Sequence, residues 1–265
     1  MVDIIRSAKS GSDWTRNELL AYNIKVVPRP PEQFFGAATA GVSLSGLDPL
    51  VITGSTDTPD VSDTTLRYLT YLDLATRASQ ETLIDEFSRQ TLDLLGYAER
   101  GLALFTRYII PLTICGEGKS AQTDVCLVDR RSMILLVLQE DKMVFDSSNP
   151  EPQVIAEAIA AYQHNNDQRE RRGLPALDSM VIPCITMVGT RPTFYLVPVN
   201  QALSDAVTTG RYPPMLTEVF KCVTVAGHNR SSCEGMEKPE YRRLALERFV
   251  AFKTLAQNHW TKFLI

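Results

Sequence analysis

The hydrophobic residues in the middle of the chain are spaced first as in a helix and then as in strands. From Gln80 to Leu95 they recur every three or four residues, which predicts an amphipathic helix that Gly96 ends. Short apolar runs separated by polar turns follow, and this pattern is typical of β-strands. We expect strands over residues 102–115, 124–128, 133–138, 181–188 and 193–197.

A second helix is predicted between the third and the fourth of these strands. Pro150 suits its first turn, and Ile155, Ile159 and Tyr162 give it one apolar face. The predicted order is therefore helix, three strands, helix and two strands. This order predicts an α/β fold with a mixed central sheet.

The segments on either side of this core carry weaker patterns. We expect residues 1–75 to form an N-terminal arm and linker, residues 76–200 the core, and residues 201–265 a C-terminal helical extension packed on the core. Within the arm, Phe34 and Phe35 are expected to anchor the segment on the core, because prolines break the chain just before them.

The composition is that of an ordinary globular protein, with 44% hydrophobic and 22% charged residues. No apolar run approaches the roughly 18 residues that span a bilayer, so we expect no membrane partner. Five widely spaced cysteines favour free, buried thiols and an intracellular protein, cytoplasmic or nuclear. The net charge of −4 argues against a chain that coats nucleic acid through a basic surface, although a metal-centred site can still contact phosphates.

The candidate chemistry lies in the segment from Gln122 to Lys142. Its two apolar runs flank a polar turn at residues 129–132, which predicts a β-hairpin. Because the start of one strand lies beside the end of the next in a hairpin, Asp124, Glu140 and Lys142 are expected at one end of the sheet. Two carboxylates and an ammonium in that position can hold a divalent metal beside a phosphate.

This arrangement resembles the PD-(D/E)xK nuclease superfamily. The resemblance is carried by Asp124 and by Glu140-Asp141-Lys142 within the predicted αβββαβ order, with one extra strand, and it covers about the central half of the chain. Thr123 stands where the family often has proline. The resemblance implies a restriction-endonuclease-like core and a nuclease that hydrolyses nucleic-acid phosphodiester bonds with Mg²⁺ or Mn²⁺.

The resemblance also implies a role for each residue. Asp124 and Glu140 would bind the metal, and Lys142 would orient or help activate the attacking water. Glu86, on the helix before the strands, would be an accessory acid and a further metal ligand, and Gln153 would contact substrate or water.

Two alternatives and one geometric condition remain open. Asp85 or Glu81 could take the place of Glu86, and charged exits from apolar strands are also common on solvated surfaces. The second functional hypothesis is therefore a catalytically inactive nuclease-like fold that binds protein or nucleic acid. Because strand side chains alternate, Asp124 shares a face with Glu140 only if the hairpin loop has three or five residues or a bulge corrects the phase.

Overall fold

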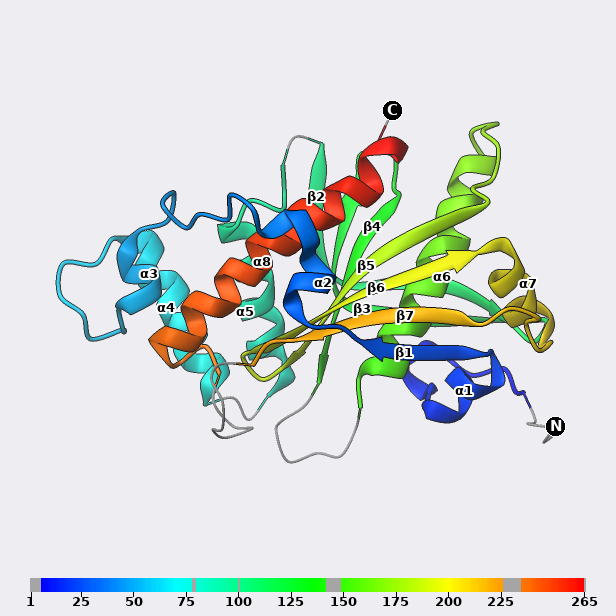
Figure 1. Ribbon diagram of the computed structural model, residues 1–265, viewed down its shortest axis with the longest axis horizontal. Coiled ribbons are helices and arrows are strands. Elements are labelled where there is room, and N and C mark those ends of the chain that lie inside the picture. Colours follow the sequence, from blue (N-terminus) through cyan, green and yellow to red (C-terminus); the bar gives the residue numbers. More distant parts are fainter. Residues whose placement is uncertain (1–5, 78–79, 100, 142–148, 226–234, 265) are drawn as a thin grey trace.

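The computed structural model describes residues 6–77, 80–99, 101–141, 149–225 and 235–264. Its centre is a seven-stranded mixed sheet with the strand order β1-β7-β6-β5-β4-β3-β2, so the α/β class is confirmed (Figure 1). The strands are β1 (Ile24–Pro28), β2 (Leu102–Ile114), β3 (Glu117–Asp129), β4 (Ile134–Asp141), β5 (Ser179–Val188), β6 (Arg191–Asn200) and β7 (Thr217–Val223).

Helices cover both faces of this sheet and begin at residues suited to that role. Thr15 and Glu18 form a capping box at the start of α1, the Ser62 side chain caps α4, and proline stands in the first turn of α6 and of α8. The helices are α1 (Arg16–Ala21), α2 (Pro31–Phe35), α3 (Pro49–Thr53), α4 (Asp63–Thr76), α5 (Glu81–Leu94), α6 (Glu151–Glu170), α7 (Gln201–Thr209) and α8 (Pro239–Trp260), with short 3₁₀ turns η1 (Gly11–Asp13), η2 (Gly36–Thr39) and η3 (Thr261–Phe263).

The central elements follow one another in the predicted order. Helix α5 precedes the antiparallel strands β2, β3 and β4, and α6 then leads to β5, which pairs in parallel with β4. Strand β6 follows as the antiparallel neighbour of β5. A parallel neighbour requires a crossover connection, and α6 supplies it.

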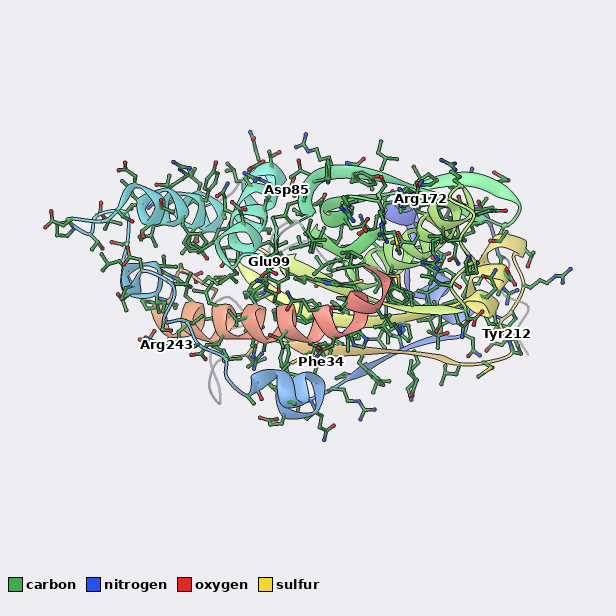
Figure 2. The ribbon with its side chains drawn as sticks, turned by 90° about the horizontal axis from the view of Figure 1, so that it is seen from above. Phe34, Asp85, Glu99, Arg172, Tyr212 and Arg243 are labelled. Atoms are coloured by element: carbon green, nitrogen blue, oxygen red, sulfur yellow. The ribbon has the colours of Figure 1, made fainter. Side chains whose placement is uncertain are left out.

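The flanking segments are more closely joined to the sheet than the sequence indicates. Strand β1, from the arm, pairs in parallel with β7. The expectation that residues 201–265 are helical holds for α7 and α8 but misses β7, whose alternation of buried and exposed residues is short. The aromatic anchor of the arm is confirmed: Phe34 stacks on Phe252 of α8 with ring centroids 6.3 Å apart (Figure 2).

The two faces of the sheet contact different helices. Lys221 of β7 and Tyr195 of β6 lie opposite each other, and the Lys221 ammonium bonds the Glu151 carboxylate of α6 at 2.7 Å. Phe194, the next residue along β6, packs instead on Phe249 of α8 with ring centroids 5.2 Å apart. One face is therefore the α6 face and the other the α8 face, because neighbouring residues of a strand point to opposite sides.

The sheet and its two helical layers bury a continuous apolar core. Cys126, Cys184 and Cys222 are buried in it as free thiols, as expected from their apolar surroundings. Among the described residues, no helix combines the length and the apolar character required to span a membrane.

Candidate active site

The hairpin loop between β3 and β4 has one of the lengths, three or five residues, that would place Asp124 and Glu140 on one face of the sheet. The last pair before the loop is Val128 with Ile134, which leaves the five residues 129–133 between the partners. The Asp129 carboxylate fixes this loop by accepting hydrogen bonds from the backbone N–H groups of Arg131 and Met133, both at 2.8 Å. Asp129 is therefore a structural residue of the turn.

The register then changes in a way that the sequence did not indicate. It shifts between Leu127 and Val128, and the ladder ends with the pair Val125 and Leu138. Directly opposed residues share a face, so a regular continuation from this pair would turn position 124 away from position 140. The bulge thus reverses the phase that the five-residue loop provides.

Strand β3 is not regular beyond that pair. Val125 lies on the α8 face, because the pairs Val125–Leu138, Leu138–Ile185 and Ile185–Phe194 connect it to Phe194. Ala121, in contrast, lies on the α6 face: a Cβ atom on Gly11 would come within 2.8 Å of the Ala121 Cβ and 3.7 Å of the Ala156 Cβ.

Residues four positions apart on a regular strand point to the same side. Because Ala121 and Val125 point to opposite sides, β3 changes phase between them. Thr123 faces Glu157 of α6 and therefore lies on the α6 face, like Ala121. The change of phase thus falls between Thr123 and Val125. Asp124, half-buried, is the residue between them.

The neighbouring strand is distorted at the same level. The pairs Thr106–Val125 and Tyr108–Thr123 place Arg107 opposite Asp124, and the ladder skips that pair. Arg107 has a φ of 51°, in the left-handed region that L-residues avoid at a cost on the order of 1–3 kcal/mol. Its guanidinium donates to the Thr82 hydroxyl of α5 at 2.9 Å. Strain of this kind is retained where the surroundings impose it, and it often marks a functional site.

A buried carboxyl group that the sequence analysis overlooked lies behind this irregularity. Glu157 of α6 is fully buried, and burial followed by the negative charge of Asp124 raises its pKa well above the ordinary value. Gln153 and Thr123 face the carboxyl and partly offset this rise. Among the described residues, however, neither Glu157 oxygen has a hydrogen-bond partner of normal geometry. The available signal was an acid within the apolar run of residues 154–162.

The Thr123 hydroxyl is directed elsewhere. Its oxygen lies 3.0 Å from the carbonyl oxygens of Val125 and of Leu138, to which the hydroxyl proton can be donated. These bonds hold the end of the β3–β4 ladder together where the strands cease to pair. They also explain why Thr123 does not satisfy Glu157.

Helix α5 presents a different acid to the interior from the one expected. Glu86 is on the helix surface, 37% exposed, and pairs with Arg89 at 3.2 Å. Asp85 is buried at 6% exposure, and its Oδ1 atom has no hydrogen-bond partner among the described residues (Figure 2). Of these two neighbours, Asp85 is the one whose side chain is buried.

The remaining predicted residues are placed only in part. Positions 140 and 141 end β4 and pair with Met187 and Val188 of β5, but their side chains lie outside the described part of the chain, as does Lys142. Gln153 is half-buried in the first turns of α6, on the side of Glu157. The described side chains include no group of three or more metal-ligating residues close enough to share an ion.

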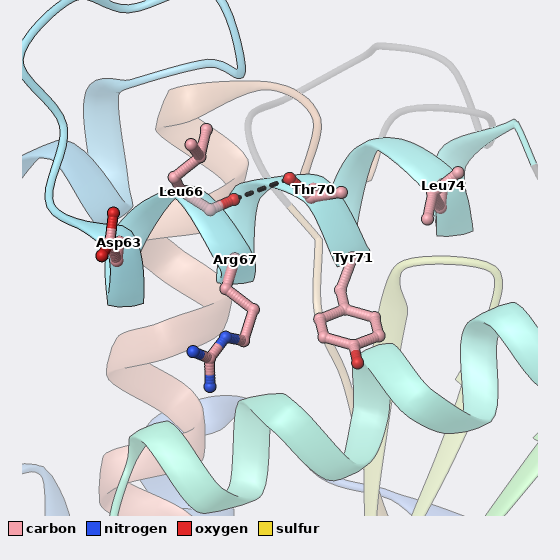
Figure 3. A pocket seen from close by; sticks show the side chains of 6 residues that line it. All are labelled: Asp63, Leu66, Arg67, Thr70, Tyr71 and Leu74. Carbon is pink, nitrogen blue, oxygen red and sulfur yellow. Dashed lines mark hydrogen bonds between the residues drawn. The ribbon is translucent and has the colours of Figure 1, made fainter.

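A hollow in the surface lies away from these residues. It has a volume of about 450 Å³ and is lined by side chains of α4 alone, as Figure 3 shows. In it the Thr70 hydroxyl donates to the Leu66 carbonyl at 2.8 Å, a bond internal to the helix. A groove along one helix does not bring together the polar groups from several elements that catalysis requires.

Comparison with known proteins adds no family to this picture. No protein-family model matches the chain, and no curated protein matches it either.

Proposed function

We propose that the chain is a metal-dependent nuclease with a restriction-endonuclease-like core, which hydrolyses phosphodiester bonds through Asp124, Glu140 and Lys142. The observation that supports this most is the change of phase in β3 at Asp124. A regular strand would turn position 124 away from position 140, and the change of phase removes that restriction on Asp124.

The topology gives further support. A helix, three antiparallel strands, a crossover helix and a parallel fourth strand follow in the order that the nuclease resemblance implies. Asp124 and the end of β4 lie at one edge of this arrangement, beside the step where β3 and β4 cease to pair.

The residues present fit Mg²⁺ or Mn²⁺, which prefer carboxylate oxygens. A cation held by Asp124 and Glu140 would lower the pKa of a coordinated water and neutralise charge on the phosphate. Lys142 would orient the attacking water. Asp85 takes the accessory role in place of Glu86, because it is buried with one oxygen available, whereas Glu86 is paired on the surface. Gln153 would contact substrate from α6.

The test is cleavage of DNA and RNA with Mg²⁺ or Mn²⁺ and with a chelator. We expect Asp124→Asn and Lys142→Ala to lower the rate by about 10²-fold or more, the scale of losing a group that acts in the transition state. Asp85→Asn and Glu86→Gln are a matched pair, neighbouring acids on one helix, and only the first is expected to reduce the rate. Wild-type protein that cleaves neither nucleic acid under any metal condition would refute the nuclease.

The register of the β3–β4 ladder favours a second function. The last pair of that ladder, Val125 with Leu138, sets position 124 out of phase with position 140, and two acids that point apart would leave the fold to serve as a protein- or nucleic-acid-binding module. The same assays separate the two hypotheses. A binding module retains its affinity for its partner in the Asp124→Asn variant and shows no metal-dependent cleavage.

A further inference from the structure

The Glu157 carboxyl group requires a partner that the described residues do not provide. It is fully buried, and both of its oxygens lack a hydrogen bond of normal geometry. A buried acid is unfavourable unless it is protonated, hydrogen-bonded or neutralised by a cation. The identity of its neighbours decides among these three.

Those neighbours bring a second negative charge to the carboxyl, and a cation can neutralise both charges at once. Asp124 adds a second carboxylate, close enough for its charge to act on Glu157. Gln153, one helical turn before Glu157, faces the carboxyl and can offer its amide oxygen to a cation. The Thr123 hydroxyl lies 3.0 Å from two backbone carbonyl oxygens and donates its proton there rather than to Glu157.

We propose that Glu157 and Asp124 together ligate a divalent cation of the Mg²⁺ and Mn²⁺ class between β3 and α6. Glu157 is then a metal ligand that the D…ExK pattern does not contain. The inference deepens the proposed function, on which it rests for the use of the metal. The change of phase at Asp124 makes the pairing possible, because it places Asp124 between the α6 face and the α8 face of the sheet.

The site follows from the way the chain folds locally. Gln153 and Glu157 are four residues apart on α6 and therefore lie on one side of that helix. The Lys221–Glu151 ion pair, 2.7 Å long, holds the start of the same helix to the sheet. Asp124 is the next residue of β3 beyond the last pair of the β3–β4 ladder, and its charge acts on Glu157 of this helix.

The experiment measures binding of Mn²⁺ to the full chain, from the loss of the electron paramagnetic resonance signal of free Mn²⁺. The variants are Glu157→Gln and Asp124→Asn, with Glu170→Gln as the control, an exposed acid at the far end of α6. We expect at least a tenfold weaker affinity in the first two variants and no change in the control. Melting curves in chelator establish that each variant is folded. If Glu157→Gln does not fold, Glu157→Asp replaces it, because the shortened side chain keeps the charge but withdraws the oxygens.

Cleavage assays on the same preparations separate this inference from the proposed function. Mn²⁺ affinity that survives in Glu157→Gln or Glu157→Asp but is lost in Asp124→Asn overturns the role of Glu157 and leaves the nuclease intact. Wild-type protein that binds Mn²⁺ through both acids but cleaves nothing supports the site and refutes the nuclease. Wild-type protein without Mn²⁺ affinity overturns the inference, whatever its activity.

Discussion

We predict that Asn165 holds the start of β4, and with it the candidate site, in place. Its side chain is fully buried on α6 and bonds both backbone groups of Ile134, the first residue of β4. The amide oxygen accepts from the Ile134 N–H at 2.7 Å, and the amide nitrogen donates to the Ile134 carbonyl at 2.8 Å. Ile134 pairs with Val128 of β3, but the pairing of β4 with β5 begins only at Val137, so Asn165 serves Ile134 on the side of β5.

Replacement of Asn165 by leucine keeps the volume but leaves two buried backbone groups without partners. Each such group costs about 1–3 kcal/mol, so the free energy of unfolding should fall by about 4 kcal/mol. That is a large part of the roughly 5–15 kcal/mol that stabilises a typical domain. Urea denaturation followed by far-UV circular dichroism measures the difference directly.

The neighbouring residue supplies a matched control. Asn166 bonds both backbone groups of Leu177 in the same way, at 2.8 and 3.4 Å, but it is only half-buried. Water can replace its side chain, so Asn166→Leu should cost about 1 kcal/mol or less. The reasoning is refuted if Asn165→Leu costs no more than Asn166→Leu, because burial of the orphaned groups would then not decide the loss.

Two further predictions concern the remainder of the fold. Arg242 is buried and donates to the carbonyls of Met236 at 2.7 Å and of Val51 and Gly54 at 3.0 Å. Thermal melts should therefore show that Arg242→Met lowers the free energy of unfolding by about 3 kcal/mol or more. The neighbouring change Arg243→Met should be near neutral. Burial, and then Lys262, lowers the pKa of His259, so the unfolded chain binds the extra proton first. The free energy of unfolding should therefore fall as pH drops below about 6.5. As a control, Glu or Lys in place of Arg243 should not alter the slope of the free energy of unfolding against pH. Glutamine in place of His259 should flatten it, and an unchanged slope in that variant would exclude His259 as the cause.

The sequence indicated the central elements well because their patterns are local. The amphipathic spacing of α5 and the apolar runs of β2 to β6 each reflect burial of one face of a single element. Strand β7 was missed because its seven residues alternate only weakly and one of its two partners, β1, comes from the distant start of the chain. No local pattern encodes that pairing.

The candidate site was harder to predict for the same reason. The alternation of strand side chains allowed a loop of three or five residues to be predicted. The bulge beside Val128 and the change of phase at Asp124, in contrast, depend on contacts with α6 and α8. The choice between Asp85 and Glu86 depends on which side of α5 meets the sheet, and adjacent positions differ by about 100° around a helix. Glu157 gave only a faint signal, a single acid in an apolar run.

The pairing of β1 with β7 sets a delay during synthesis. Ile24 pairs with Thr217, which is made 193 residues later. At the usual ribosomal rate of about 5–20 residues per second, β1 waits about 10–40 seconds for its partner. During that interval the arm emerges with an unpaired strand and the aromatic pair Phe34 and Phe35 uncovered, so the nascent chain presents a hydrophobic segment that chaperones would recognise long before the last helix is complete.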